Sequence, residues 1–254
     1  EDSAPGERLA LDGTSCKKTS LGGSKFWYAV LDYGTDIAWS LFVKKKSEMP
    51  ERMLTFIKKL RATKKYPVKY IRCDNAGENY SLQKLCDQEG MGIQFEFTPR
   101  DSPQFNGRLE RKLATLWTRT RSILNAARLD ATMRAGVWAE AARHSTDVDN
   151  SLVTERKEAP SYQQFYGLSW KGLKHLHQFG EVAVVKTAAQ HQSKLDNRGD
   201  VCMYLGKAPD HADDVHRFLK LSTKQIIVSR DVTWLNKVYG DWKGLKRPMP
   251  EEVV

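Results

Sequence analysis

Two acidic residues, Asp74 and Glu110, stand where a carboxylate could take part in chemistry. Asp74 ends a short apolar run and precedes Asn75-Ala76-Gly77, a pattern typical of a strand that enters a turn. Glu110 opens a segment whose apolar residues recur with the period of an amphipathic helix. Carboxylate oxygens are the ligands that Mg²⁺ and Mn²⁺ prefer, and a pair of such ions can support displacement at phosphorus. Thirty-five residues separate the two acids, a spacing that has no diagnostic value alone.

The residues around both acids make this spacing informative. The flanks DNAGEN (74–79) and SPQFNGRLER (102–111) resemble the integrase core of LTR retrotransposons, most closely the copia-type branch, and the resemblance runs from about residue 7 to about residue 234. It implies an Asp, Asp, Glu triad whose first member lies on the first strand, here Asp12. It also implies that Asp12, Asp74 and Glu110 are catalytic and hold two Mg²⁺ or Mn²⁺ ions. The implied activity is trimming of DNA 3′ ends followed by strand transfer into target DNA.

Four other polar residues near the predicted site could be alternative or supporting members of it. Asp32 and Asp36 flank a predicted strand, so either could replace Asp12 as the first acid. Glu78 and Asn79 closely follow Asp74, and we interpret them as turn residues that orient a metal site rather than as ligands.

The hydrophobic pattern predicts the elements that position these acids. Strands are expected at residues 8–12, 25–31, 37–43, 68–74 and 93–97, and helices at residues 47–65, 81–88, 110–127 and 136–150. This order is that of an α/β, ribonuclease-H-like fold, a mixed five-stranded sheet with flanking helices. In that fold the first and fourth strands are neighbours, which would bring Asp12 and Asp74 together. Short strands with turn signals follow from residue 179 and predict a small β-rich module.

The predicted domains are a catalytic core at residues 1–150, a connection at 151–178, the β-rich C-terminal module at 179–238 and a tail at 239–254. Copia-type integrases also carry an upstream zinc module with two His and two Cys ligands, and this sequence contains none. We therefore expect a piece of a polyprotein, or a decayed or captured copy. Two alternative functions stay open: a non-catalytic DNA-binding module derived from a retroelement, and a nuclease for RNA–DNA hybrids.

The charge balance predicts a polyanionic partner. Forty-one Lys and Arg residues against 31 Asp and Glu residues give a net charge of +10 and a pI near 9.4. No apolar run approaches the ~18 residues needed to cross a bilayer, and the first residues do not have the order of a signal peptide. Nucleic acid is therefore favoured over a membrane. The resemblance implies double-stranded DNA as the partner, a homo-oligomer on DNA, and localisation to the nucleus and to retroelement particles in the cytoplasm.

Basic residues on the polar side of the Glu110 segment are the predicted phosphate contacts: Arg108, Arg111, Lys112, Arg119 and Arg121. The run Lys44-Lys45-Lys46 is interpreted as a solvated or DNA-facing edge rather than a nuclear targeting signal. His175, His177, His211 and His216 could be metal ligands, but no matching Cys or carboxylate spacing accompanies them, which favours packing or surface roles. The four cysteines occur singly, a pattern that suits a reducing compartment.

Overall fold

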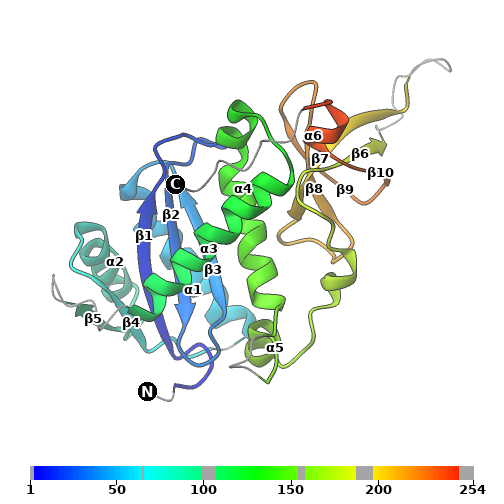
Figure 1. Ribbon diagram of the computed structural model, residues 1–254. Helices are drawn as coiled ribbons and strands as arrows, with labels where there is room; N and C mark the ends of the chain where they lie inside the picture. The colour runs from blue at the N-terminus through cyan, green and yellow to red at the C-terminus, as the bar shows by residue number, and fades with distance from the viewer. Residues whose placement is uncertain (1–2, 65, 99–106, 154–157, 187–196, 246–254) are drawn as a thin grey trace, which may run out of the picture. The chain divides into compact units, whose positions relative to one another are not determined.

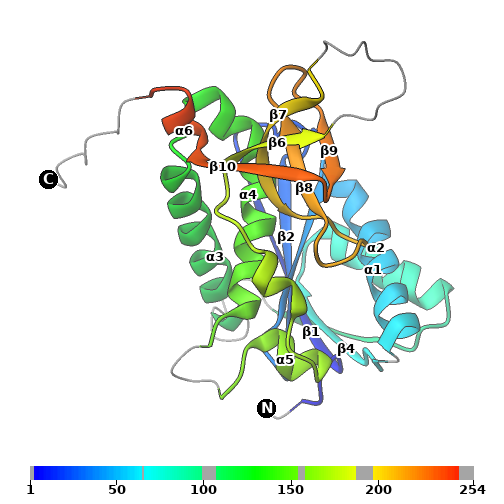
Figure 2. The same cartoon turned by 90° about the vertical axis from the view of Figure 1, so that its right-hand side faces the viewer.

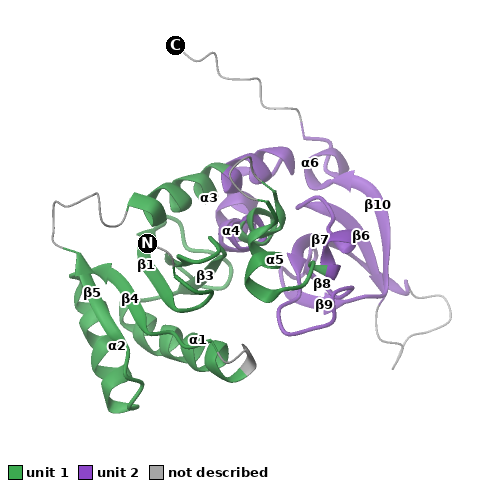
Figure 3. Ribbon diagram, turned by 90° about the horizontal axis from the view of Figure 1, so that it is seen from below, with its two compact units in different colours: residues 1–118, 146–170 green, residues 119–145, 171–254 purple. Residues whose placement is uncertain are grey.

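The computed structural model describes residues 3–64, 66–98, 107–153, 158–186 and 197–245, and the chain forms two compact units (Figures 1 and 3). The first unit comprises Glu1–Thr118 and Thr146–Trp170, and the second comprises Arg119–Ser145 and Lys171–Val254. Helices α3 and α4 each contribute to both units. The elements of the first unit are β1 (Arg8–Ser15), β2 (Phe26–Asp32), β3 (Ala38–Val43), η1 (Lys46–Glu48), α1 (Met49–Lys64), β4 (Tyr70–Asp74), α2 (Gly77–Gln88), β5 (Gln94–Thr98), the start of α3 (Gly107–Ala126), the end of α4 (Ala131–Ser151) and α5 (Ser161–Tyr166).

The first unit is built on a mixed five-stranded sheet in the order β3-β2-β1-β4-β5 (Figure 1), and Figure 2 shows β1, β2 and β4 of this sheet after a turn of 90°. Strands β1, β2 and β3 pair antiparallel, as expected for consecutive strands joined by short connections, whereas β1–β4 and β4–β5 are parallel. This arrangement confirms the predicted fold class, a mixed five-stranded sheet with helices followed by an antiparallel β module. It also makes β1 and β4 direct neighbours at the centre of the sheet.

Both faces of this sheet are covered, because its strands carry apolar residues on both sides. Helices α1 and α2 lie on one face, and α3 lies on the other (Figure 3). The α1 side contains a buried core that includes Leu11, Val30 and Ile57. On the α3 side, Trp27 of β2 meets Trp117 edge-on, with ring centroids 4.9 Å apart. A sheet buried on two faces is a rigid platform for residues at its strand ends.

The second unit contains an antiparallel five-stranded sheet in the order β10-β6-β7-β8-β9. Its elements are the end of α3, most of α4, η3 (Lys171–His175), β6 (Glu181–Lys186), β7 (Gly199–Lys207), β8 (His216–Lys220), β9 (Ile226–Ser229), β10 (Val232–Val238) and α6 (Tyr239–Trp242). Its core joins Val182 and Met203 of the sheet to Leu124 and Val137 of the two helices. None of the helices in the described part of the chain is long and apolar enough to cross a membrane.

Helix α2 begins four residues earlier than the sequence pattern predicts, at Gly77 instead of residue 81. Residues 75–79 of the run DNAGEN include strong turn formers, and their pattern predicts a turn. In the structure, the N–H of Asn79 already bonds the carbonyl of Ala76, so the helix starts inside the run. The early start brings Glu78 and Asn79 into the first turn of α2, beside Asp74. The domain boundaries stay a prediction, and residues 246–254 of the predicted tail lie outside the described residues.

Candidate active site

Asp12 and Asp74 stand at the same level on two adjacent parallel strands. In the register of β1 and β4, Ala10 pairs with Arg72, and each acid lies two residues beyond that pair. Side chains two apart on a strand point to the same face, so both carboxylates follow the direction of Ala10 and Arg72. Although 61 residues separate the two acids in the sequence, the sheet brings them together.

A small pocket collects these acids and several other polar groups. It encloses about 130 Å³ and is lined by Leu11, Asp12, Gly13, Thr14, Ser15, Phe26, Tyr28, Lys46, Asp74, Glu78 and Asn79. This volume is below the ~300–1,000 Å³ typical of sites for organic cofactors. The pocket is therefore suited to ions, water and small groups such as a phosphate.

Glu110 joins the site through its charge. The pKa of Asp12 is raised from 3.8 to about 6. Burial is the largest cause, the negative charges of Asp74 and Glu110 add to it, and one hydrogen bond acts in the opposite direction. That hydrogen bond runs from the N–H of Gly13 to Asp12 Oδ1 over 2.7 Å. Glu110 is exposed in the first turn of α3. The structure therefore brings Asp74 and Glu110 into electrostatic range of Asp12.

The donor set matches a hard divalent cation in its chemistry. Burial, and to a smaller extent the charges of Asp74 and Glu110, make the ionised form of Asp12 costly, and an Mg²⁺ or Mn²⁺ ion between carboxylates would offset that cost. Over the residues that the structure describes, however, no group of three His, Cys, Asp or Glu side chains is arranged to hold a metal ion. The metal-ligand roles of Asp12, Asp74 and Glu110 stay predictions.

Asn79 holds the Asp74 carboxylate in place. Its Nδ2 donates to Asp74 Oδ1 over 2.6 Å and to the Asp74 carbonyl over 3.1 Å. The N–H of Ala76 donates to the same Oδ1 over 3.2 Å. Asn79 is 4% exposed, so this amide is fixed within the fold. It fixes the Asp74 side chain, and its predicted role in orienting a metal site stays a prediction.

The two alternative first acids lie outside this pocket. The Asp32 carboxylate is fully buried and accepts hydrogen bonds from the N–H of Gly6 and from both the N–H and the hydroxyl of Thr35. Burial raises its pKa, and these hydrogen bonds act in the opposite direction. Asp36 pairs with Arg108, with Oδ1 2.6 Å from Nη2. Asp32 therefore stabilises the turn after β2, and Asp36 anchors the start of α3.

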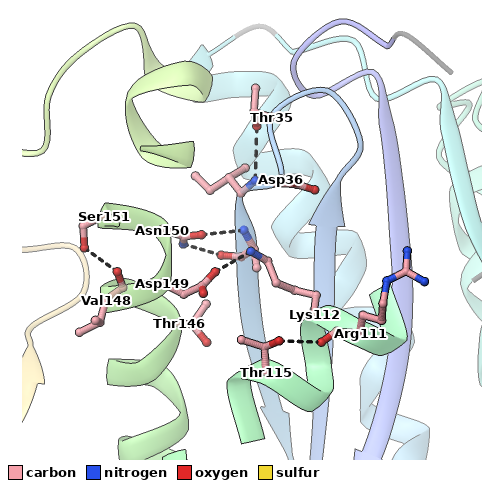
Figure 4. Close-up of polar contacts among 12 residues, drawn as sticks. Thr35, Asp36, Arg111, Lys112, Thr115, Thr146, Val148, Asp149, Asn150 and Ser151 are labelled. Atoms are coloured by element: carbon pink, nitrogen blue, oxygen red, sulfur yellow. Dashed lines mark hydrogen bonds and ion pairs between the residues drawn. The ribbon is translucent and has the colours of Figure 1, made fainter. Parts of the chain in front are cut away.

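The predicted phosphate-binding residues differ in what they contact. Figure 4 shows Lys112 directed at Asp149 of α4, with an Nζ–Oδ2 distance of 2.5 Å, whereas Arg111 points away from that pair. Lys112 is largely buried, and Arg108 is paired with Asp36. Arg111 and Arg121 are exposed, and Arg119 is half-buried. Arg111 and Arg121 are therefore the most accessible residues of the predicted set. The role of all five residues in DNA binding stays a prediction.

Two histidines belong to an aromatic cluster in the second unit. The ring of His177 stacks on Trp234 with centroids 3.5 Å apart, and the His216 ring lies 5.7 Å from that of His177. Burial lowers the pKa of His216 to about 4. These two histidines therefore serve packing. His211 Nδ1 lies 2.7 Å from the carbonyl of Pro209 on an exposed loop.

Tyr28 and Lys46 line the pocket and were not singled out as site residues by the sequence. Tyr28 lies in an apolar run, where the sequence predicts an ordinary core aromatic residue, and no sequence signal separates it from its neighbours. Lys46 had a partial signal, because it ends a run of three lysines. Residues 102–106 of the second flank, which helped to identify Glu110, lie outside the described residues.

Comparisons with known proteins agree with this architecture. A family model described as the retroviral polymerase SH3-like domain matches residues 181–247, which include the second sheet. The Pol polyprotein from transposon TNT 1-94 of Nicotiana tabacum is 25% identical over 221 residues, 85% of this chain and 16% of that protein. The Pol polyprotein from transposon RE1 of Arabidopsis thaliana is 25% identical over 229 residues, 90% of this chain and 15% of that protein.

The chain thus spans about a sixth of the length of these curated relatives. The sequence similarity extends across both units, and the family model accounts for the C-terminal sheet. Taken together with the fold, the chain is similar to a region of copia-type retrotransposon Pol polyproteins, and its residues 181–247 match the retroviral polymerase SH3-like domain.

Proposed function

We propose that this chain is a retroelement integrase core, which trims DNA 3′ ends and transfers them into target DNA. The observation that carries the proposal is the placement of Asp12 and Asp74 at one level of neighbouring strands in one pocket, with the charge of Glu110 acting on Asp12. Two carboxylates in one pocket, with the charge of a third acid acting on one of them, favour metal-dependent chemistry at phosphorus. The similarity to retrotransposon Pol polyproteins supports the same class of reaction.

In this proposal Asp12, Asp74 and Glu110 hold two Mg²⁺ or Mn²⁺ ions. When bound, such ions activate the attacking oxygen and neutralise charge on the leaving oxygen. The Asn79 amide fixes the Asp74 carboxylate by a hydrogen bond, and the N–H of Gly13 donates to the carboxylate of Asp12. The basic surplus supplies contacts to the sugar–phosphate backbone, which carry little sequence information. Double-stranded DNA as partner, assembly as a homo-oligomer, and a nuclear and particle-associated location are parts of the same proposal.

The test uses the 254-residue chain with labelled oligonucleotides that carry retroelement ends, in the presence of Mg²⁺ or Mn²⁺. We expect shortened and joined products. Asp74→Asn should reduce their rate of formation by roughly 10²-fold or more, the scale for removal of one group that stabilises transition-state charge. Asp87→Asn is the matched control, because Asp87 is an exposed acid on α2 that does not line the pocket.

Equal rates for wild type and Asp74→Asn would refute catalysis at this site. Salt-sensitive binding of duplex DNA without any metal-dependent cleavage would instead support the non-catalytic module. Selective cleavage of RNA–DNA hybrids would support the nuclease alternative.

A further inference from the structure

Lys46 places a positive charge on the rim of the acidic pocket. It opens η1, three residues after the end of β3, and it lines the pocket together with Asp12 and Asp74. Its side chain is 59% exposed, and its Nζ lies 3.4 Å from Glu78 Oε1 and 6.0 Å from the centre of the Phe26 ring. The ammonium group is therefore held near one position while it stays open to solvent.

Glu78 is a fixed anchor for this lysine. Its side chain is 14% exposed, and Oε1 accepts a hydrogen bond from the Tyr28 hydroxyl over 2.9 Å. Burial acts to raise the pKa of Glu78, but its own backbone N–H, the Tyr28 hydroxyl and Lys46 outweigh burial and lower it. Glu78 is thus ionised at neutral pH. The Tyr28 ring packs directly against Gly13. A Cβ atom at position 13 would lie only 2.4 Å from that ring, so a larger residue there would displace Tyr28.

This anchoring is poorly explained by stability alone. An ion pair with one exposed partner contributes little to folding, because water screens it. An ammonium group carries three N–H donors, so contact with Glu78 leaves capacity for further oxygen atoms. A pocket with Asp12 and Asp74 repels phosphate, and a cation on the same rim offsets part of that repulsion.

The register of the sheet shows where this cation acts. Phe26, which lies beneath Lys46, pairs with Ser15, whereas Asp12 pairs with Ala29. Three residues along β1 correspond to about 10 Å between the Cα atoms of Asp12 and Ser15, so the Phe26 ring beside Lys46 belongs to a part of the sheet beyond Asp12. Lys46 is therefore suited to a phosphate beside the reacting one.

We propose that Lys46, positioned by Glu78 and Tyr28, binds a phosphate of the DNA strand next to the phosphate that reacts at Asp12 and Asp74. The inference rests on the proposed function and adds a substrate contact to it. Lys46 would contribute uniform binding, which changes KM and leaves kcat nearly unaltered.

The experiment compares Lys46→Ala, Lys46→Arg and Lys45→Ala. Lys45 is the matched control, because it is an exposed neighbour with the same charge and does not line the pocket. For cleavage of end-labelled duplexes with Mg²⁺, Lys46→Ala should raise KM about tenfold while kcat changes less than about twofold, and Lys46→Arg should largely restore KM. In metal-free binding, Lys46→Ala should lower the slope of log affinity against log salt by about 0.9, the value for one phosphate.

A strand with one neutral methylphosphonate linkage, moved one nucleotide at a time, locates the contact. At the linkage beside the cleavage position, the neutral group should weaken wild-type binding but leave Lys46→Ala binding unchanged. Equal KM, equal salt slopes and equal methylphosphonate profiles for Lys46→Ala and Lys45→Ala would overturn the inference. Absence of cleavage by the wild type would overturn the proposed function instead, and the metal-free salt slope and methylphosphonate scan would still decide the role of Lys46.

Discussion

Asp12 should destabilise the folded protein at neutral pH when no metal is bound. Its pKa is raised from 3.8 to about 6, chiefly by burial and further by the charges of Asp74 and Glu110. A carboxyl group with a higher pKa in the folded state binds more protons there than in the unfolded state between these two values. Stability therefore falls as pH rises from about 4 to about 6, and the cost is fully present above pH 6. Replacing Asp12 with Asn removes this cost.

The size of the effect follows from the two pKa values. A pKa change from 3.8 to about 6 corresponds to at most about 3 kcal/mol, since a shift of one pKa unit is worth about 1.36 kcal/mol. Asp12 is partly exposed, so solvent screening reduces this figure. We expect Asp12→Asn to raise the free energy of unfolding by about 1–3 kcal/mol at pH 8. At pH 4 the expected gain is only about 0.5 kcal/mol.

Urea unfolding at pH 4 and pH 8, in buffers with chelator, measures this difference. Asp87→Asn is again the control, because Asp87 is exposed and does not line the pocket. A gain of the same size at both pH values would refute the electrostatic reasoning, since packing differences between Asp and Asn do not titrate. A loss of stability at pH 8 would show that the Gly13 hydrogen bond outweighs the buried charge.

Two further predictions concern buried charge elsewhere. Asp149→Ala should lower the free energy of unfolding by about 3–5 kcal/mol in urea titrations, because it leaves the charge of the largely buried Lys112 uncompensated. Arg111→Ala, at an exposed position, is the control and should change it by less than ~0.5 kcal/mol. An equally small change for Asp149→Ala would contradict the role of this buried ion pair. Burial lowers the pKa of His144 from 6.5 to about 4, so stability present above pH 6.5 is lost as pH falls, by roughly 2 kcal/mol at pH 5. His144→Phe should remove that part of the difference in unfolding free energy between pH 7 and pH 5, and an unaltered difference would argue against it.

The strand pattern was sufficient to predict the platform of the site. Alternating and continuous apolar runs indicated five strands and their order along the chain, and the structure confirms a mixed sheet in which β1 and β4 are neighbours. Asp12 and Asp74 follow directly, because each ends or nearly ends the apolar part of its strand. The start of α2 was predicted less well, since turn-forming residues there occupy the first helical turn.

The partners of the basic residues could not be predicted in the same way. Helical periodicity places Arg108 and Lys112 on the polar side of α3, which suggests solvent or phosphate contacts. In the fold, Arg108 meets Asp36 and Lys112 meets Asp149, residues that are distant in the sequence. Spacing along one helix defines which side chains share a face, but it carries no information about which segment packs against that face.

The sequence by itself predicted most of the elements and the three candidate acids, and it fixed the positive net charge, because periodicity, composition and local motifs are properties of short segments. Only the tertiary structure decided which charges are paired and which face solvent. The same packing surrounds Asp12 with two other carboxylates, raises its pKa, and brings Lys46 to the rim of the pocket. Burial and Coulomb interactions depend on distances between segments remote in the chain, so they exist only once the sheet has formed.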